Sequence, residues 1–300
     1  MIEPMRIALV GLFFILCAAS PCANSSDQTF LSIPFDYDVH PGVTYIHRSG
    51  WEGKLDLLIP GDGMAAKGTL VWFHGGGWTR SSKDQELLYV LPYLYRRWSV
   101  INVEYRLANV ANAPAAASDA LCAMRWLTKH RAEYNLPLDR LVVSGISAGG
   151  AMALFAGTIS ASSPLALDCG SEDQFGEIPV PRVIVNWFGP SNLVDLIEGP
   201  HRQTQVVAWF ENIPDRIGVA NALSPVMYIR SAVPPVITIH GENDESVPFA
   251  QSVALHRLLT STHTPNRLVR IRAGHGDFTA AQAAYSYGEV FAFINKILRK

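Results

Sequence analysis

Ser147 lies in a pattern that could make its hydroxyl group a nucleophile. Residues 145–149 read Gly-Ile-Ser-Ala-Gly, between the apolar run 141–144 and a run of small and apolar residues. This is G-x-S-x-G between a predicted strand and a predicted helix, the context in which the motif forms a sharp elbow. So tight a turn has strained dihedrals and close neighbours, which explains the flanking glycines. The pattern predicts a serine hydroxyl exposed at a helix amino terminus, where developing negative charge is stabilised.

Such a serine needs a base that takes its proton and an acid that orients the base. His275 is the predicted base, because it follows the last apolar run directly and is flanked by glycines. The acid must come from Glu242, Asp244 or Glu245, which follow the apolar run before it. We predict Asp244 and expect its neighbours to be solvated loop charges. In folds where a strand, a sharp elbow and a helix carry the nucleophile, the three residues follow one another along the chain in the order serine, acid, histidine. His240, at the end of its strand, is expected to be packed and hydrogen-bonded rather than catalytic.

The stretch His74-Gly75-Gly76-Gly77-Trp78 ends another apolar run and is expected to present backbone amides to an oxyanion. Glycines leave the backbone accessible and allow φ values that are closed to other residues. We predict Gly75 and Gly76 as donors, with Gly76 the better candidate, and Ala148 as the further donor. A phosphate-binding loop is the other interpretation of a glycine run, but Trp78-Thr79-Arg80 does not supply the lysine and the Ser or Thr hydroxyl at the spacing that such a loop requires. His74 is expected to hold the loop, and Trp78 is a candidate for substrate binding or for a core cap.

The elements that must position these residues follow a simple alternation. From residue 69 onward, short apolar runs typical of strands buried on both faces alternate with segments of helical pattern. The runs are 69–74, 99–105, 140–146, 182–188, 235–241 and 267–272, and the helical segments are 84–97, 115–134, the stretch from 147, 247–261 and 285–300. Segments 43–48 and 54–60 alternate like half-buried strands of an antiparallel edge. The order predicts an α/β fold with a mostly parallel central sheet flanked by helices. Segments 160–181 and 198–223 are long enough to form lids or substrate walls.

Composition sets the broader class. The chain has 300 residues, 49% hydrophobic and 17% charged, with a formal net charge of -2 and no block of like charge, so we expect no nucleic-acid partner. Residues 1–23 have the layout of a secretory signal peptide, which predicts a secreted or periplasmic protein without a stable membrane span after cleavage. Residues 24–300 are expected to form one domain. Cys122 and Cys169 then remain, either as one disulfide or as buried free thiols.

The ordered motifs resemble those of the α/β-hydrolase superfamily, and more narrowly the hormone-sensitive-lipase-like and BD-FAE (feruloyl/acetyl esterase)-like carboxylesterases. They comprise HGGGW at 74–78, VEYRL at 103–107, Asp119, GISAGG at 145–150, FGPSNL at 188–193, Ser224-Pro225, HGEND at 240–244, Val247-Pro248 and GHG at 274–276. The resemblance implies the triad Ser147, Asp244 and His275, an oxyanion hole from the amides of Gly75, Gly76 and Ala148, and no metal or cofactor. Glu104, where many relatives have aspartate, and Asn192 depart from the family pattern. The short stretch before the first strand favours a small or open cap.

The expected activity is hydrolysis of short-chain acyl esters, or of acetyl or feruloyl esters linked to carbohydrate, through an acyl-enzyme. Three alternatives use the same motifs. A lipase would need an apolar lid, whereas segment 198–223 mixes charged and apolar residues. A serine peptidase of this kind usually carries a large gating domain. A non-catalytic binding protein would typically lack a triad residue.

Overall fold

The computed structural model describes residues 35–48, 50–61, 63–159, 169, 177–230 and 233–299, with short strands at 5–7, 10–11 and 31–32. The predicted signal peptide lies outside the described residues, apart from the backbone of β1 (Met5–Ile7) and β2 (Val10–Gly11). Most of segment 160–181 lies outside them as well. None of the helices in the described part of the chain has both the length and the apolar character needed to cross a membrane.

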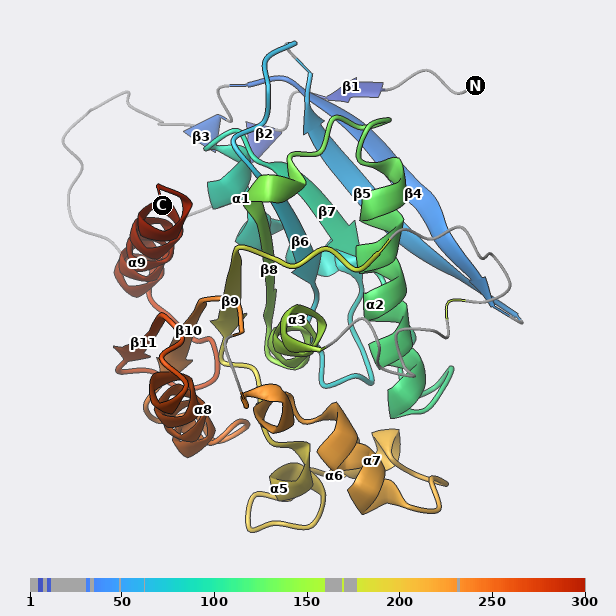
Figure 1. The fold of residues 1–300 in the computed structure, drawn as a ribbon, viewed down its shortest axis with the longest axis vertical. Helices are drawn as coiled ribbons and strands as arrows, with labels where there is room; N and C mark the ends of the chain where they lie inside the picture. The colour runs from blue at the N-terminus through green and yellow to red at the C-terminus, as the bar shows by residue number, and fades with distance from the viewer. Residues whose placement is uncertain are drawn as a thin grey trace, which may run out of the picture.

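A sheet of nine strands runs through the molecule in the order β1-β4-β5-β7-β6-β8-β9-β10-β11 (Figure 1). Its further strands are β4 (Tyr37–Arg48), β5 (Trp51–Pro60), β6 (Thr69–Phe73), β7 (Ser99–Val103), β8 (Leu141–Ile146), β9 (Val183–Trp187), β10 (Val236–Gly241) and β11 (Asn266–Ile271), while β2 pairs with β3 (Leu31–Ser32). Pairing is antiparallel from β1 to β7 and parallel from β7 to β11. The predicted mostly parallel sheet with an antiparallel edge is confirmed.

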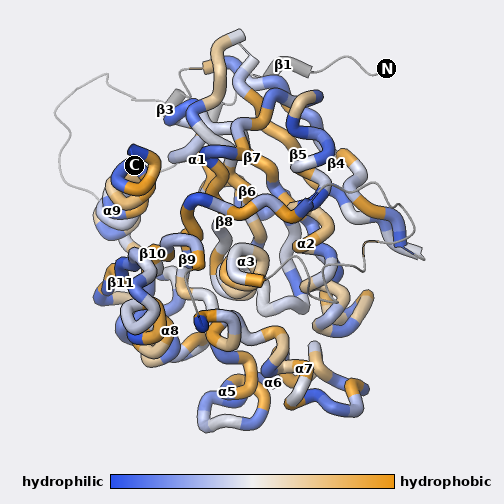
Figure 2. Tube along the Cα trace, in the orientation of Figure 1, coloured by the Kyte–Doolittle hydropathy of each residue, from blue (hydrophilic) through white to orange (hydrophobic). Residues whose placement is uncertain are grey.

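Helices cover both faces of the sheet (Figure 1). They are α1 (Leu87–Leu94), α2 (Ala113–His130), α3 (Ala148–Thr158), α5 (Leu193–Ile197), α6 (Thr204–Trp209), α7 (Arg216–Leu223), α8 (Phe249–Ser261) and α9 (Ala280–Leu298), with 3-10 turns at Lys83–Glu86, Leu138–Arg140 and Pro225–Tyr228. Apolar residues of α2, α3 and α8 form one core with the sheet, and those of α1 and α9 form the other. The helices carry both hydrophobic and hydrophilic residues, as along α9 (Figure 2).

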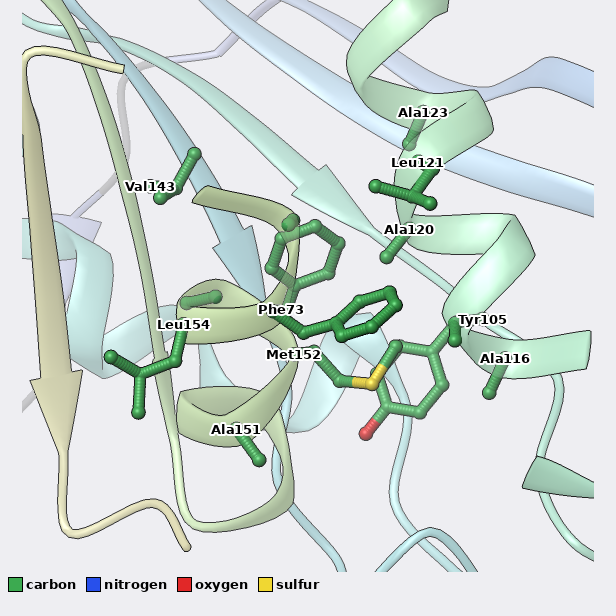
Figure 3. Packing of buried hydrophobic residues seen from close by; sticks show 14 of the residues in the cluster. Phe73, Tyr105, Ala116, Ala120, Leu121, Ala123, Val143, Ala151, Met152 and Leu154 are labelled. Carbon is green, nitrogen blue, oxygen red and sulfur yellow. The ribbon is translucent and has the colours of Figure 1, made fainter. Parts of the chain in front are cut away.

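The larger core lies between α2, α3 and the sheet. Phe73 from the end of β6, Tyr105 after β7 and Met152 of α3 gather there and are buried (Figure 3). Small residues such as Ala116 and Ala120 on α2 let this helix pack closely. The ends of β6 and β8, where the candidate site residues follow, are therefore anchored in tightly packed surroundings.

The helices α5, α6 and α7 form a small cap beyond the carboxyl ends of the parallel strands (Figure 1). Asn192 begins α5 by accepting hydrogen bonds from the amides of Val194 and Asp195, which is an N-cap. Two of these helices come from segment 198–223. The sequence indicated a wall here but not its helical structure.

Cys122 in α2 and Cys169 form a disulfide, with 5.4 Å between their Cα atoms. The sequence left a disulfide and two free thiols open, and the structure shows the disulfide. It ties Cys169 to the middle of α2.

Candidate active site

Ser147 occupies the turn between β8 and α3 with φ 51° and ψ -119°, a conformation that L-residues rarely adopt. The flanking glycines allow this turn because they lie against the end of β6. A Cβ on Gly149 would come within 2.0 Å of the Phe73 carbonyl oxygen, and one on Gly145 within 2.5 Å of it. The Ser147 amide donates to the Trp187 carbonyl at 2.9 Å. The predicted strand-elbow-helix is present, with the helix beginning at Ala148.

The structure brings Ser147, His275 and Asp244 into one hydrogen-bonded chain. The hydroxyl oxygen of Ser147 lies 2.8 Å from His275 Nε2, and His275 Nδ1 donates to Asp244 Oδ2 at 2.7 Å. In this arrangement Nδ1 carries the proton and Nε2 is free to accept the serine proton. Glu242 and Glu245 are both exposed, so Asp244 is the carboxylate of the three candidates that meets His275.

Asp244 is held in its ionised form by a set of donors around both oxygens. Its Oδ1 accepts from the amides of Ser246 and Val247 at 2.8 and 2.7 Å. His240 Nε2 lies 3.1 Å from Oδ2. Burial by itself would raise the pKa of Asp244, but the hydrogen bonds from His240, His275 and Val247 outweigh it and hold the pKa well below its usual value.

His240 is buried and hydrogen-bonded, as the sequence predicted. Its Nε2 also donates to the Val247 carbonyl at 2.9 Å, and Ser252 Oγ lies 2.6 Å from its Nδ1. Because two oxygen acceptors face Nε2, the proton resides there and Nδ1 accepts from the serine. His240 therefore helps to hold the Asp244 carboxylate in the position where it accepts from His275.

The glycine loop presents two free amides, those of Gly76 and Gly77, and the sequence predicted the first of them. The Gly75 amide donates to Glu86 Oε1 at 2.8 Å, so the predicted role of Gly75 as an oxyanion donor is wrong. Gly76 and Gly77 have φ values of 101° and 61° and line the same cavity as Ser147. No acceptor among the described residues takes their amide protons or that of Ala148. Gly76, Gly77 and Ala148 are therefore the available donors.

Glycine is required at Gly76 by close approach as well as by its dihedrals. A Cβ there would lie 2.0 Å from the Arg80 carbonyl oxygen. The amides of Thr79 and Arg80 both donate back to the Gly76 carbonyl at 3.2 Å. The loop thus closes into a tight turn immediately after Gly76.

His74 supports this loop, as expected. Its Nδ1 donates to the Gly75 carbonyl at 2.8 Å, and its ring stacks on Tyr105 with 4.3 Å between ring centroids. The Tyr105 hydroxyl donates to the His74 carbonyl at 2.7 Å. Glu104, the departure from the family pattern, lies with Oε1 3.3 Å from His74 Nε2. The departure therefore concerns the support of the loop rather than the reacting groups.

A cavity of about 330 Å³ opens beside Ser147 and His275. Apolar side chains of Trp78, Leu196 and Val206 form part of its wall, the last two from the cap. Trp78 is only 2% exposed and stacks on Trp209 of α6, with ring centroids 4.3 Å apart and an interplanar angle of 7°. Trp78 thus lines the cavity and also joins the glycine loop to the cap. Among the described residues, no group of three or more His, Cys, Asp or Glu side chains is arranged to bind a metal ion.

The family model BD-FAE matches residues 55–259, which is more than half of the chain. The chain belongs to the BD-FAE family. The match includes the glycine loop, Ser147 and Asp244 and ends before His275. The assignment of His275 to the site therefore depends on its hydrogen bonds to Ser147 and Asp244.

Two curated proteins and one solved structure that are similar to this BD-FAE chain are named as esterases. Esterase LipQ of Mycobacterium tuberculosis is 27% identical over 70% of this chain and 50% of its own length. Carboxylesterase NlhH of the same organism is 26% identical over 81% of this chain and 78% of its own. A propionate-bound structure of the esterase Est2 from Thermogutta terrifontis is 26% identical, with a TM-score of 0.71, and covers 88% of this chain and 95% of its own. The chain spans half or less of the length of the first curated relatives it matches. The α/β-hydrolase fold is confirmed.

Two residues around this BD-FAE site were missed by the sequence reasoning. Phe188, with φ 42°, packs edge-on against His275 at 4.8 Å between ring centroids. Glu86 is buried and bonded to the Gly75 amide. Burial raises the pKa of Glu86, while the Gly75 amide lowers it in part. Glu86 follows Asp84 and Gln85 in the sequence, so no local pattern distinguishes it from a surface charge.

Replacing Glu86 by leucine is expected to lower kcat by about 10- to 100-fold with little change in KM. The Gly75 amide would lose its acceptor, and leaving a buried donor unsatisfied costs about 1–3 kcal/mol, which a shift of the loop would relieve. Glu86→Gln keeps an oxygen acceptor and should stay near the wild-type kcat. The measurement is kcat and KM of the three proteins on p-nitrophenyl acetate. Equal losses in the leucine and glutamine variants would contradict a positioning role.

Proposed function

We propose that this chain is a serine carboxylesterase that hydrolyses short-chain acyl esters. The observation that carries the proposal is the hydrogen-bonded chain Ser147, His275 and Asp244 beside a cavity to which free amides of Gly76 and Ala148 are presented. A fold alone does not define a function, whereas this set of groups matches acyl transfer through a serine nucleophile. The names of the relatives support the same reaction class.

The proposed reaction has two halves. Ser147 Oγ attacks the ester carbonyl carbon while His275 Nε2 takes the hydroxyl proton, and Asp244 stabilises the resulting imidazolium. The carbonyl oxygen becomes an oxyanion that accepts hydrogen bonds from the amides of Gly76, Gly77 and Ala148. The tetrahedral intermediate expels the alcohol, which receives the proton from His275. A water molecule then attacks the acyl-enzyme with His275 as base and releases the acid and free Ser147.

The size of the cavity favours a short acyl group. At about 330 Å³ it is near the lower end for ligand pockets, and the cap closes one side of it. The propionate in the Est2 structure is a short acid of the same kind. Acetyl or feruloyl groups linked to carbohydrate are a second candidate class, because BD-FAE is the family that the chain matches.

The test is kcat/KM on p-nitrophenyl esters from acetate to dodecanoate, with acetylated xylan and methyl ferulate measured beside them. We expect the highest values at acetate to butyrate and a fall of about tenfold or more at octanoate, since the added methylenes find no further pocket. Rising values toward dodecanoate would indicate a lipase instead. Cleavage of peptide p-nitroanilides with no ester preference would indicate a peptidase.

We further propose that the protein acts outside the cytoplasm. The layout of residues 1–23 supports a signal peptide. The disulfide of Cys122 and Cys169 supports an oxidising compartment, where such bonds persist. Fractionation of producing cells, with detection of the mature amino terminus, is the direct measurement.

A further inference from the structure

The cavity beside Ser147 has a permanently charged residue in its lining. Among the described residues that line it, Arg80 is the one with a permanent charge, and no aspartate or glutamate lines it. The chain as a whole is slightly acidic, with a formal net charge of -2. An arginine without a carboxylate in the same cavity makes that cavity locally favourable to an anion.

The Arg80 side chain has no partner within the part of the chain that the structure describes. It is exposed, and no hydrogen bond or ion pair is made by its guanidinium group. The acidic residues nearest to it in sequence are already engaged. Asp84 pairs with Lys83 Nζ at 2.7 Å, and Glu86 accepts from the Gly75 amide at 2.8 Å. Arg80 lines the cavity, and the five donors of its planar fork are therefore available to a ligand.

The backbone fixes Arg80 close to the reacting groups. Its amide donates to the Gly76 carbonyl at 3.2 Å, and its own carbonyl packs where a Cβ on Gly76 would lie. The same turn thus carries a candidate oxyanion donor and the arginine. Neutral donors line the same cavity, among them Gln203, whose Oε1 accepts from Gln205 Nε2 at 3.2 Å and whose own amide protons stay available.

We propose that the natural substrate is an ester that carries a negative charge, such as a carboxylate, in addition to the scissile ester, and that Arg80 binds this charge. The inference rests on the proposed esterase function and specifies its substrate class. A guanidinium group and a carboxylate form a charge-assisted, often bidentate pair. The anion belongs either to the acyl part or to the alcohol part, and the experiment separates the two.

The test uses two matched pairs of esters. Mono-p-nitrophenyl succinate against p-nitrophenyl butyrate places the charge on the acyl side, and 4-acetoxybenzoate against its methyl ester places it on the alcohol side. For each pair, the ratio of kcat/KM for the anionic over the neutral ester is measured in the wild-type protein and in Arg80→Gln. The intrinsic reactivity of each ester is the same with every protein, so a change in the ratio reports the arginine alone.

We expect Arg80→Gln to lower the ratio by about three- to tenfold in one pair, with the neutral esters nearly unaffected. Arg80→Lys keeps the charge and should retain most of the preference. Arg257→Gln, which removes an exposed arginine of α8 that does not line the cavity, should change neither ratio. In the wild-type protein, 0.5 M NaCl should lower the affected ratio by screening.

Ratios that stay within twofold of wild type in Arg80→Gln for both pairs would overturn this inference while leaving the esterase function intact. Equal losses in Arg80→Gln and Arg257→Gln would overturn it too, because they would reflect net charge alone. A wild-type protein that hydrolyses none of the four esters would overturn the proposed function and this inference together.

Discussion

Replacing Ser147 by alanine is expected to lower kcat on p-nitrophenyl acetate by about a million-fold, to the residual rate that the oxyanion donors and binding alone supply. The hydroxyl oxygen that lies 2.8 Å from His275 Nε2 would be absent, so no acyl-enzyme could form at this position. The backbone of residue 147 has φ 51°, which alanine tolerates about as well as serine. The fold should therefore be retained.

The control for this variant is its thermal unfolding, which should have a midpoint within a few degrees of wild type. A second control is substrate binding, which should be retained because cavity-lining residues such as Trp78 and Val206 are unchanged. An alanine variant that folds and still turns over p-nitrophenyl acetate at more than a hundredth of the wild-type rate would exclude Ser147 as the nucleophile.

Replacing Asp244 by asparagine is expected to lower kcat by about ten-thousand-fold. The asparagine oxygen can keep the hydrogen bonds from the amides of Ser246 and Val247. Its amide group would then face His275, whose Nδ1 would have to accept rather than donate. The proton of His275 would move to Nε2, which could no longer take the proton of Ser147.

Glu242→Gln provides the matched control for this variant. Glu242 lies in the same loop, was a candidate for the acid, and is exposed. Its neutralisation should leave kcat within about twofold, as for a solvated surface charge. A larger loss in Glu242→Gln than in Asp244→Asn would reassign the acid.

The pKa of the Asp244 carboxyl is held low in the folded state. The ionised carboxylate therefore contributes stability at pH values above its pKa in the unfolded chain, and this stability is lost as the pH falls from that value toward the lower pKa of the folded state.

The strands and the residues that follow them could be predicted because both depend on local patterns. A strand buried on both faces is a short apolar run, and β6 to β10 were predicted this way. Run 267–272 was also predicted as such a strand, but β11 is only partly buried because it lies at the edge of the sheet. Ser147, Asp244 and His275 each follow such a run, so the ordering of the chain brings them to one edge of the sheet. The three residues come together because the strands that precede them, β8, β10 and β11, lie near one another in the sheet.

The details of the oxyanion loop could not be predicted because they depend on contacts across the fold. Three glycines identify a loop with free backbone, but they do not tell which amide is already bonded. Gly75 is engaged by Glu86, eleven residues away in a 3-10 turn whose position depends on packing. Gly77, which the sequence did not predict as a donor, lines the cavity.

The cap and the disulfide were undetermined for similar reasons. Segment 198–223 mixes charged and apolar residues, and its short helices α6 and α7 are stabilised by packing such as that of Trp209 on Trp78. Helices of this length have little stability of their own, so periodicity is weak in them. Cys122 and Cys169 are 47 residues apart, a separation that contains no information about pairing.

The central claim, that Ser147 is the residue acylated during turnover, is tested most directly by covalent labelling. The protein is treated with a p-nitrophenyl alkylphosphonate, and the adduct is located by mass spectrometry of the digested chain. The account predicts one phosphonyl group per chain, on the peptide that contains Ser147, with activity lost in proportion and no adduct in Ser147→Ala. Labelling at another residue, or full labelling of Ser147 with activity retained, would contradict it.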